Sequence, residues 1–310
     1  MELFDFCTPF INGKNVYTQE KLPIDEMGFS HRDNNYLRQI TPAHLKKGND
    51  TFEYYPSKRE EIVMYALRYL AAQQQIQCQI DKDEDLVTIG FTLHQLRNEL
   101  KRTGHGYNWR EISEAIEILS KASLSVGFDA GKRQFEWSGT YLSNVRSIDK
   151  TGNIATGESC RIVTLHPIIS KAILSASVRL INYDRDMRLK LPLSKLIYRR
   201  FIHFCRNAQA ASFAQKARGM KITIAEAFSQ AGLKRNKRLA DDVRTMGRAI
   251  KELVENDILE RGTMGFPTYE RIKDVYILYP SKTLVHEIVK GHKKQEKMDI
   301  AKAFLPPAKQ

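Results

Sequence analysis

Five consecutive hydrogen-bond donors occur in the second half of the chain, in the run Lys234-Arg235-Asn236-Lys237-Arg238. Arginine and asparagine form paired hydrogen bonds with guanine and adenine, and lysine neutralises phosphate charge. Arg244, Arg248 and Lys251 follow Lys237 at successive steps of seven, four and three residues, the spacing of one helix face. These residue types and this spacing indicate contact with a polyanion, and the alternative is an ordinary solvated helix face.

Catalytic motifs are absent from the sequence. There is no phosphate-binding GxxxxGK[ST] loop and no GxGxxG after a strand pattern. His286-Glu287-Ile288-Val289-Lys290 approaches a zinc motif, but a lysine stands where the second histidine ligand is required. No pattern of activating residues accompanies the candidate nucleophiles Tyr54, Tyr55 and Tyr198, so nothing distinguishes them from any other tyrosine. We therefore expect no enzymatic activity, no cofactor and no metal.

Positive charge is concentrated in one part of the chain. The net charge of the 310 residues is +13. Residues 1–190 hold 25 Lys and Arg against 24 Asp and Glu, whereas residues 191–310 hold 24 against 12. A surface that only maintains solubility needs no such asymmetry, so residues 191–310 are expected to bind a polyanion, and nucleic acid is favoured over a membrane or an acidic protein.

Composition is that of a globular protein with room for two domains. Apolar residues make up 42% of the chain, and no run of 18 apolar residues is long enough to span a membrane. The start of the sequence lacks the basic and apolar regions of a signal peptide, so we expect a cytoplasmic protein without a membrane partner. The four cysteines are scattered, which favours buried thiols over disulfides or metal ligands.

Helix and strand signals begin after an irregular leader, residues 1–55, in which one or two strands are expected. Three capping patterns open predicted helices at Ser57, Thr92 and Asn108, each with Glu or Gln three residues later. A short strand is expected at 86–91 between the first two helices, and a hairpin over 124–137 after the third. Further strands are expected at 140–147 and 161–166, followed by a short helix.

The same order of elements is predicted again from residue 193. A helix over 193–205, with Leu193, Ile197, Phe201 and Phe204 inward, precedes a strand at 220–222, a capped helix from Thr223 and a break at Gly232. Leu239, Val243, Met246, Ile250 and Leu253 define a long helix, and strands at 258–260 and 275–279 follow it. Both halves therefore predict a winged helix, a helix-turn-helix followed by a β-hairpin, within the α+β class.

The two predicted copies differ in the charge of their last helix, which in a helix-turn-helix lies in the major groove. In the first copy this helix carries Glu111, Glu114 and Glu117, which would repel phosphates, so we assign that copy to a protein–protein interface. In the second copy it begins with the basic run. Cations on the neighbouring elements are predicted to make further contacts with DNA, and Arg199 and Arg200 are predicted to point away from the core. These cations are Arg199, Arg200, Lys221, Arg261, Arg271 and Lys273.

The chain resembles plasmid replication initiators built from two winged helices, the RepA- and TrfA-like family, over residues 56–280. The resemblance is carried by 55–60, 88–96, 119–128, 193–200 and 250–261. It implies sequence-specific binding to repeated origin sites (iterons), opening of the duplex, and recruitment of host proteins such as the initiator, helicase or sliding clamp. It also implies a homodimer formed through the first winged helix, often the inactive or autorepressing form in plasmid copy control.

We accordingly predict a leader at 1–55, a dimerising winged helix with minor DNA contacts at 56–185, a sequence-specific DNA-binding winged helix at 186–280, and a helix with a basic tail at 281–310. Two alternatives remain open. The first is a transcriptional repressor of the same fold, and the second is a nicking or strand-transfer enzyme, for which a covalent tyrosine–DNA adduct would be evidence.

Overall fold

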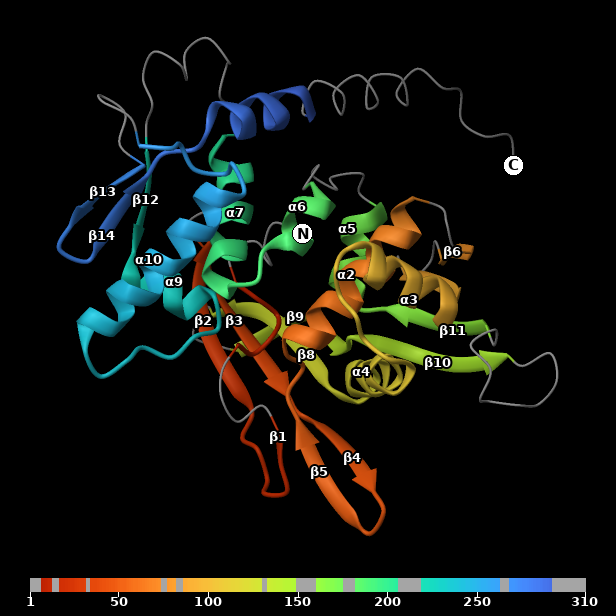
Figure 1. The fold of residues 1–310 in the computed structure, drawn as a ribbon. Helices are drawn as coiled ribbons and strands as arrows, with labels where there is room; N and C mark the ends of the chain where they lie inside the picture. Colours follow the sequence, from red (N-terminus) through yellow and green to blue (C-terminus); the bar gives the residue numbers. More distant parts are fainter. Residues whose placement is uncertain are drawn as a thin grey trace. The chain divides into compact units, whose positions relative to one another are not determined.

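The computed structural model describes residues 7–12, 17–31, 34–73, 77–81, 86–129, 133–148, 160–174, 182–205, 219–262 and 268–291 (Figure 1). The chain divides into two compact units. The first comprises residues 1–178 with 229–234, and the second comprises 179–228 with 235–310. Each combines α-helices with antiparallel sheets, which confirms the α+β class.

The elements of the first unit are listed here in chain order: β1 (Tyr17–Thr18), β2 (Asp25–His31), β3 (Asn34–Thr41), β4 (Ala43–Lys47), β5 (Asp50–Tyr54), α2 (Lys58–Ala72), β6 (Gln77–Asp81), β7 (Leu86–Thr92), α3 (Leu93–Arg102), α4 (Trp109–Lys121), β8 (Ser123–Asp129), β9 (Arg133–Thr140), β10 (Leu142–Ile148), β11 (Cys160–Leu165) and α5 (Pro167–Leu174). Those of the second are α6 (Tyr183–Arg188), α7 (Pro192–Phe204), β12 (Met220–Thr223), α9 (Ile224–Gln230, whose last two residues are counted with the first unit), α10 (Leu239–Glu255), β13 (Tyr269–Ile272), β14 (Val275–Leu278) and a helix over 282–291.

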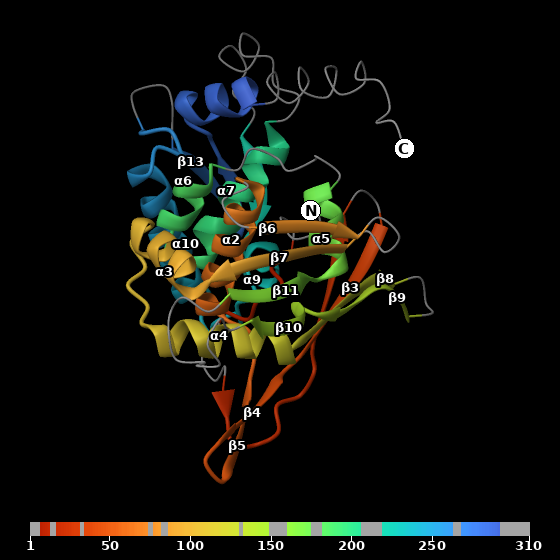
Figure 2. The ribbon, with the colours of Figure 1, turned by 90° about the vertical axis from the view of Figure 1, so that its right-hand side faces the viewer.

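The leader contains more regular structure than predicted. The expectation of one or two strands is wrong, because β1 to β5 all lie before residue 55. β3 pairs with β2 on one side and with β8 on the other, and β9 completes this four-stranded sheet, which Figure 2 shows beside the sheet of β7 and β11. Leu37 and Ile40 on β3 are buried by this pairing. β2–β3 and β4–β5 are hairpins within the leader, whereas β3 also pairs with β8, which lies more than 80 residues further along the chain.

Local signals for the helices are confirmed. Thr92 Oγ1 accepts from Gln95 N at 3.1 Å while the Gln95 side chain accepts from Thr92 N at 2.8 Å, so α3 begins with a complete capping box. Asn108 and Glu111 do the same for α4. Thr223 caps α9 by accepting from Glu226 N, and the Glu226 carboxylate accepts a hydrogen bond from Arg200.

Strand pairing revises the predicted wings. The hairpin β8–β9 exists, but it joins the leader sheet and not β7. β7 pairs instead with β11, which pairs with β10, giving the order β10-β11-β7-β6. In the second unit the order is β12-β14-β13, so the strand between the first two helices pairs with the last strand in both units. The order β10-β11-β7 of the first unit thus corresponds to β13-β14-β12 of the second, while β6 adds a fourth strand beside β7 and β8–β9 precede β10 in the chain.

The predicted strand at 258–260 is also corrected. The partner of β14 is β13, whose two-residue turn at Lys273 and Asp274 closes the hairpin. Residues 258–260 contribute one isolated bridge, Leu259 to Pro280, next to a hydrogen bond from Glu260 N to Tyr279 O. The strand predicted at 275–279 is present as β14 (Val275–Leu278). The strand Tyr269–Ile272 is exposed along its whole length, so no alternation of buried apolar residues marks it in the sequence.

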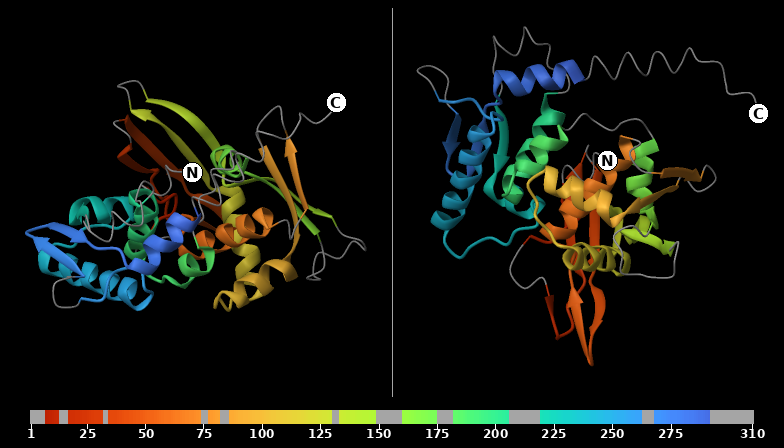
Figure 3. Two further views of the ribbon diagram at one scale, coloured as in Figure 1. Left: turned by 90° about the horizontal axis from the view of Figure 1, so that it is seen from above. Right: turned by 45° about the vertical axis from the view of Figure 1, so that its right-hand side comes forward.

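The core of the second unit lies between its helices and this sheet (Figure 3). Leu193, Ile197, Phe201 and Met246 are buried as predicted. The burial predicted for two residues is wrong, because Phe204 is 37% exposed and Leu239 is 47% exposed. Both stand at a helix end, where periodicity continues beyond the residues that the neighbouring elements cover.

Carboxylates link the helices of the second unit. Glu252 of α10 accepts from the backbone of Lys190 at 2.7 Å and Leu191 at 3.1 Å, just before α7 begins. Glu287 of the helix over 282–291 accepts two hydrogen bonds from Arg185 of α6, at 2.7 and 3.1 Å. The contacts of Glu252 join α10 to the segment before α7, and those of Glu287 join the helix over 282–291 to α6.

A buried histidine makes the first unit sensitive to acid. His166 is fully buried, its Nε2 lies 3.0 Å from Leu124 O, and its Nδ1 accepts from Ile168 N. Burial lowers its pKa to about 4, against the opposing effect of the hydrogen bond to Leu124. The ring is therefore neutral, whereas the unfolded chain takes up a proton near pH 6.5.

Stability of the first unit should therefore be full above about pH 6.5 and fall as the pH approaches about 4, because the unfolded state binds the extra proton in that window. We expect His166 to account for about 2–3 kcal/mol of the loss between about pH 7.5 and about pH 4.5. Urea unfolding followed by fluorescence measures it, since both tryptophans, Trp109 and Trp137, lie in this unit. The His166→Gln variant should lose about 2–3 kcal/mol less stability over this pH range than the original protein. An equal loss in both proteins would contradict the role given to His166.

Among the described residues, no helix is long and apolar enough to cross a membrane. Cys7 and Cys205 are buried and free, as the scattered cysteines predicted, and Cys160 is half-buried and free. Burial raises the thiol pKa of Cys7 to about 11 and of Cys205 to about 12, so neither is a reactive thiolate.

Candidate nucleic-acid interface

The turn between α9 and α10 presents the basic run at the surface. Lys234, Arg235, Asn236, Lys237 and Arg238 are all exposed. The side chains of Lys234, Lys237 and Arg238 make no hydrogen bond or ion pair with the part of the chain that the structure describes. Their donors are therefore available to a ligand at the start of α10.

Asp242 holds this turn in its conformation. Its carboxylate is fully buried and accepts from the side chain of Arg235, from Asn236 N at 2.9 Å and from Asn236 Nδ2 at 2.8 Å. Burial alone would raise its pKa, but the hydrogen bonds from Asn236 and Arg235 outweigh it and hold the pKa below its ordinary value. The Asn236 side chain is therefore already hydrogen-bonded within the protein. It can pair with a base, as predicted, only if its hydrogen bond to Asp242 breaks.

Asp242→Ala should destabilise the second unit by about 1–3 kcal/mol, because three donors lose their acceptor. It should also weaken duplex binding about 3- to 10-fold, since the neighbouring cations are no longer held in place before binding. Urea unfolding and fluorescence anisotropy with a labelled duplex measure the two effects.

Asp241→Ala is the matched control. Asp241 is 43% exposed and forms only a surface pair with Arg244, at 3.3 Å. Its loss should change stability by no more than about 0.5 kcal/mol and should strengthen duplex binding, because a carboxylate leaves a cationic surface. Weaker binding by both variants in equal measure would contradict the role given to Asp242.

A stripe of exposed side chains continues along α10 from the turn. Arg244 is 76% exposed and Lys251 is 79% exposed, and Arg248 between them donates to Thr245 Oγ1 at 3.2 Å. Asp241 and Glu255 stand at the two ends of this stripe. The predicted alignment of Arg244, Arg248 and Lys251 on one side is confirmed.

The hairpin β13–β14 offers a second group of cations. Arg271 and Lys273 are exposed at its turn, and the Arg271 guanidinium lies 5.9 Å from the Tyr276 ring centroid and donates to Lys273 O. Ile272 between them is 62% exposed. Lys221 is exposed on β12, on the far side of β14 from β13. Arg261, 71% exposed, pairs with Asp257 at 3.2 Å.

Two predicted contact residues are buried. The expectation that Arg199 and Arg200 point away from the core is wrong. The Arg199 side chain is 3% exposed and donates twice to Asp186, at 3.0 and 2.9 Å. Arg200 is 8% exposed and donates to Glu226 at 2.6 Å. Helical periodicity placed both on the polar side of α7, but α6 and α9 pack over that side and supply the carboxylates.

The corresponding turn of the first unit lacks such cations. Between α3 and α4 the sequence is Thr103-Gly104-His105-Gly106-Tyr107-Asn108, with no lysine or arginine. On α4 itself, Glu117 pairs with Lys121 at 2.6 Å, and Glu111 accepts from the backbone of Asn108. The carboxylates predicted to lie on α4 are therefore largely engaged in contacts within the protein.

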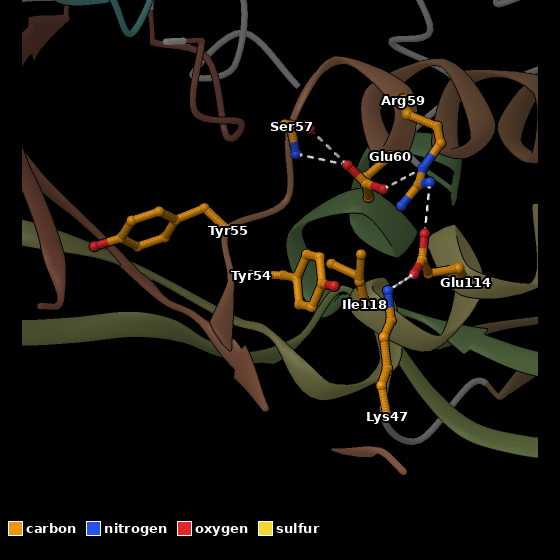
Figure 4. A pocket seen from close by; sticks show the side chains of 8 residues that line it. All are labelled: Lys47, Tyr54, Tyr55, Ser57, Arg59, Glu60, Glu114 and Ile118. Atoms are coloured by element: carbon orange, nitrogen blue, oxygen red, sulfur yellow. Dashed lines mark hydrogen bonds and ion pairs between the residues drawn. The ribbon is translucent and has the colours of Figure 1, made fainter. Parts of the chain in front are cut away.

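Glu114 of α4 lies in a pocket of about 380 Å³ and is not on the open surface (Figure 4). It accepts from Arg59 of α2 at 2.7 Å and from Lys47 of β4, while Arg59 also pairs with Glu60 at 2.8 Å. Burial raises the pKa of Glu114, but the hydrogen bonds from Lys47 and Arg59 outweigh it and hold the pKa below its ordinary value. The charges in the pocket balance, and they join α4 to α2 and β4.

The surroundings of Tyr198 and Tyr55 disfavour a role as nucleophile. Tyr198 is 1% exposed, its hydroxyl accepts from Asn182 N at 3.1 Å, and burial raises its pKa. Tyr55 is also buried, donates to Pro23 O, and has a raised pKa for the same reason. Among the described residues, no group of three or more His, Cys, Asp and Glu side chains is placed to hold a metal ion.

Solved structures provide the comparison with known proteins. The fold is similar to a crystal structure of domains 2 and 3 of RctB, with a TM-score of 0.52 and 10% identity over 91% of this chain and 99% of that one. A second crystal structure of RctB domains 2–3 gives a TM-score of 0.49 and 10% identity over 93% and 99%. No protein-family model matches the chain, and no curated protein matches its sequence significantly. At this identity the likeness shows the fold.

Proposed function

We propose that this protein is a replication initiator that binds double-stranded origin DNA sequence-specifically through its second unit. In this proposal both units are winged helices, α10 lies in the major groove, and the β13–β14 turn contacts the adjacent backbone or minor groove. The proposal keeps the chain in the cytoplasm and gives it no catalytic turnover.

One observation carries the proposal: Lys234, Lys237 and Arg238 stand exposed at the turn before α10, and their side chains have no partner among the described residues. A charge left without an internal partner contributes little to folding, whereas it contributes strongly to binding a polyanion through counterion release. The turn between α3 and α4 carries no lysine or arginine, so the cations are particular to the turn before α10.

The specific role comes from the plasmid replication initiators that the sequence resembles, and domains 2 and 3 of RctB share the fold. We extend this role to the present chain, together with repeated binding sites, opening of the duplex and recruitment of host replication proteins. Opening follows if contacts are made only to bent or melted DNA, because such contacts shift the equilibrium toward the open form. The first unit then serves self-association, as in the plasmid initiators that the sequence resembles.

Contacts are divided among the cations by their exposure. Lys234, Lys237, Arg238, Arg244 and Arg248 face the groove and its phosphates, and the cations of the sheet and the following loop reach the flanking backbone: Lys221, Arg261, Arg271 and Lys273. Arg199 and Arg200 position α7 from within and do not touch DNA.

Selection from a pool of random duplexes of about 30 base pairs tests the binding. The full chain should enrich one sequence and bind it about 10³-fold or more tightly than a scrambled duplex. With about five phosphates neutralised, log K should fall with log salt at a slope of about −4 to −5. Failure to enrich any sequence would overturn sequence-specific binding.

Replication is tested separately. Resistance-marked circles without an origin of their own receive fragments of the DNA that encodes this chain, and the protein is supplied in trans. Circles that carry the selected sequence should be maintained only when the protein is present. Binding without maintenance would instead support the transcriptional repressor.

A further inference from the structure

A glycine lies in the middle of α10, on its exposed side. Gly247 is exposed, three residues after Arg244 and directly before Arg248. Its backbone does not have the positive φ that favours glycine, and a Cβ built on it would have no atom within 4 Å in the described structure. Neither conformation nor internal packing therefore requires glycine at this position.

Glycine at this position makes the helix less stable. Inside an exposed helix it is the least favourable residue after proline, because it loses the most backbone freedom on folding. α10 is 17 residues long, and its other side is a regular apolar face that includes Met246, Ile250 and Leu253.

The missing side chain leaves a low point in the cationic surface. Ala240, two turns earlier, is exposed on the same side, so two of the smallest residues stand among Arg244, Arg248 and Lys251. A helix backbone can approach a ligand most closely where no side chain projects. The long basic side chains on either side can extend past this point to reach phosphates.

We propose that Gly247 is the point of closest approach between the α10 backbone and duplex DNA, and that its lack of a side chain sets the depth to which α10 enters the groove. The inference rests on the proposed function and deepens it. The occupant is double-stranded DNA, because the surface around Gly247 is predominantly cationic and complementary to phosphate.

The test uses two readouts that should move in opposite directions. Gly247→Ala should raise the Tm of the second unit by about 2–4 °C, because alanine is the better helix former. It should nevertheless weaken binding to the selected duplex about ten-fold or more, because the methyl group occupies space that the DNA needs. Gly247→Leu should bind more weakly still. Differential scanning calorimetry and fluorescence anisotropy measure the two properties.

Asn98→Ala is the matched control. Asn98 is exposed on α3 of the first unit, so alanine should stabilise that helix and leave duplex binding unchanged. If Gly247→Ala stabilises the protein and binds as the original does, or if it lowers the Tm, the inference is overturned. Arg248→Ala separates this failure from a wider one. If Arg248→Ala weakens binding while Gly247→Ala does not, only the role of Gly247 is lost. If neither affects binding, the proposed function fails at this helix.

Discussion

Replacing Asp186 with alanine is expected to destabilise the second unit by about 3–5 kcal/mol, because it leaves Arg199 charged and buried without the carboxylate that holds it. Both side chains are 3% exposed, and two hydrogen bonds join them. A loss of that size is a large part of the stability of an ordinary domain, so much of the second unit should unfold. Hydrogen exchange measures it, as faster exchange of the amides in β12, β14 and α10.

DNA binding should fall with the fold in that variant, so a second variant is needed to separate the two. Asp186→Leu combined with Arg199→Met replaces the ion pair by apolar side chains of similar volume, which is often neutral or stabilising for a buried pair. We expect this double variant to be folded and to bind the selected duplex with unchanged affinity. A folded double variant with impaired binding would show that Arg199 contacts DNA, as its position in the sequence suggested.

Arg238→Ala is expected to weaken binding to the selected duplex by about 1–3 kcal/mol, roughly 5- to 150-fold, and to relax the preference at one base pair. The reason is geometric, because the exposed Arg238 guanidinium, which has no partner within the described ranges, can form paired hydrogen bonds with guanine. Anisotropy titrations against duplexes with each base pair substituted in turn measure the loss and locate the position.

Lys237→Ala should behave differently although the residue is adjacent. A lysine on phosphate contributes equally to every sequence, so binding should weaken uniformly and the salt slope should decrease by about one. Lys101→Ala is the control, since Lys101 is an exposed lysine at the end of α3 in the first unit and should change neither property. Unchanged affinity and preference in Arg238→Ala would mean that α10 is not the recognition helix.

The helices and their ends could be predicted from the sequence alone. Thr92 with Gln95 and Asn108 with Glu111 form the expected caps, and the apolar periods of α4 and α10 mark most of their buried residues. Such signals depend on residues within one or two helical turns of each other. The asymmetry of charge and the run from Lys234 to Arg238 were likewise visible, since long charged side chains without partners remain at the surface.

Contacts between distant parts of the chain could not be predicted. β3 of the leader pairs with β8, the hairpin β8–β9 joins the sheet of β2 and β3 instead of β7, and Arg199 lies against Asp186 and not in solvent. Asp242, an acidic residue among the cations at the start of α10, is the buried acceptor that shapes the turn. Strand partners and buried ion pairs are chosen by the free energy of packing distant segments together, which no local pattern contains. The sequence by itself therefore determined the helices and where the cations accumulate, and only the tertiary structure decided which of those cations remain available to bind DNA.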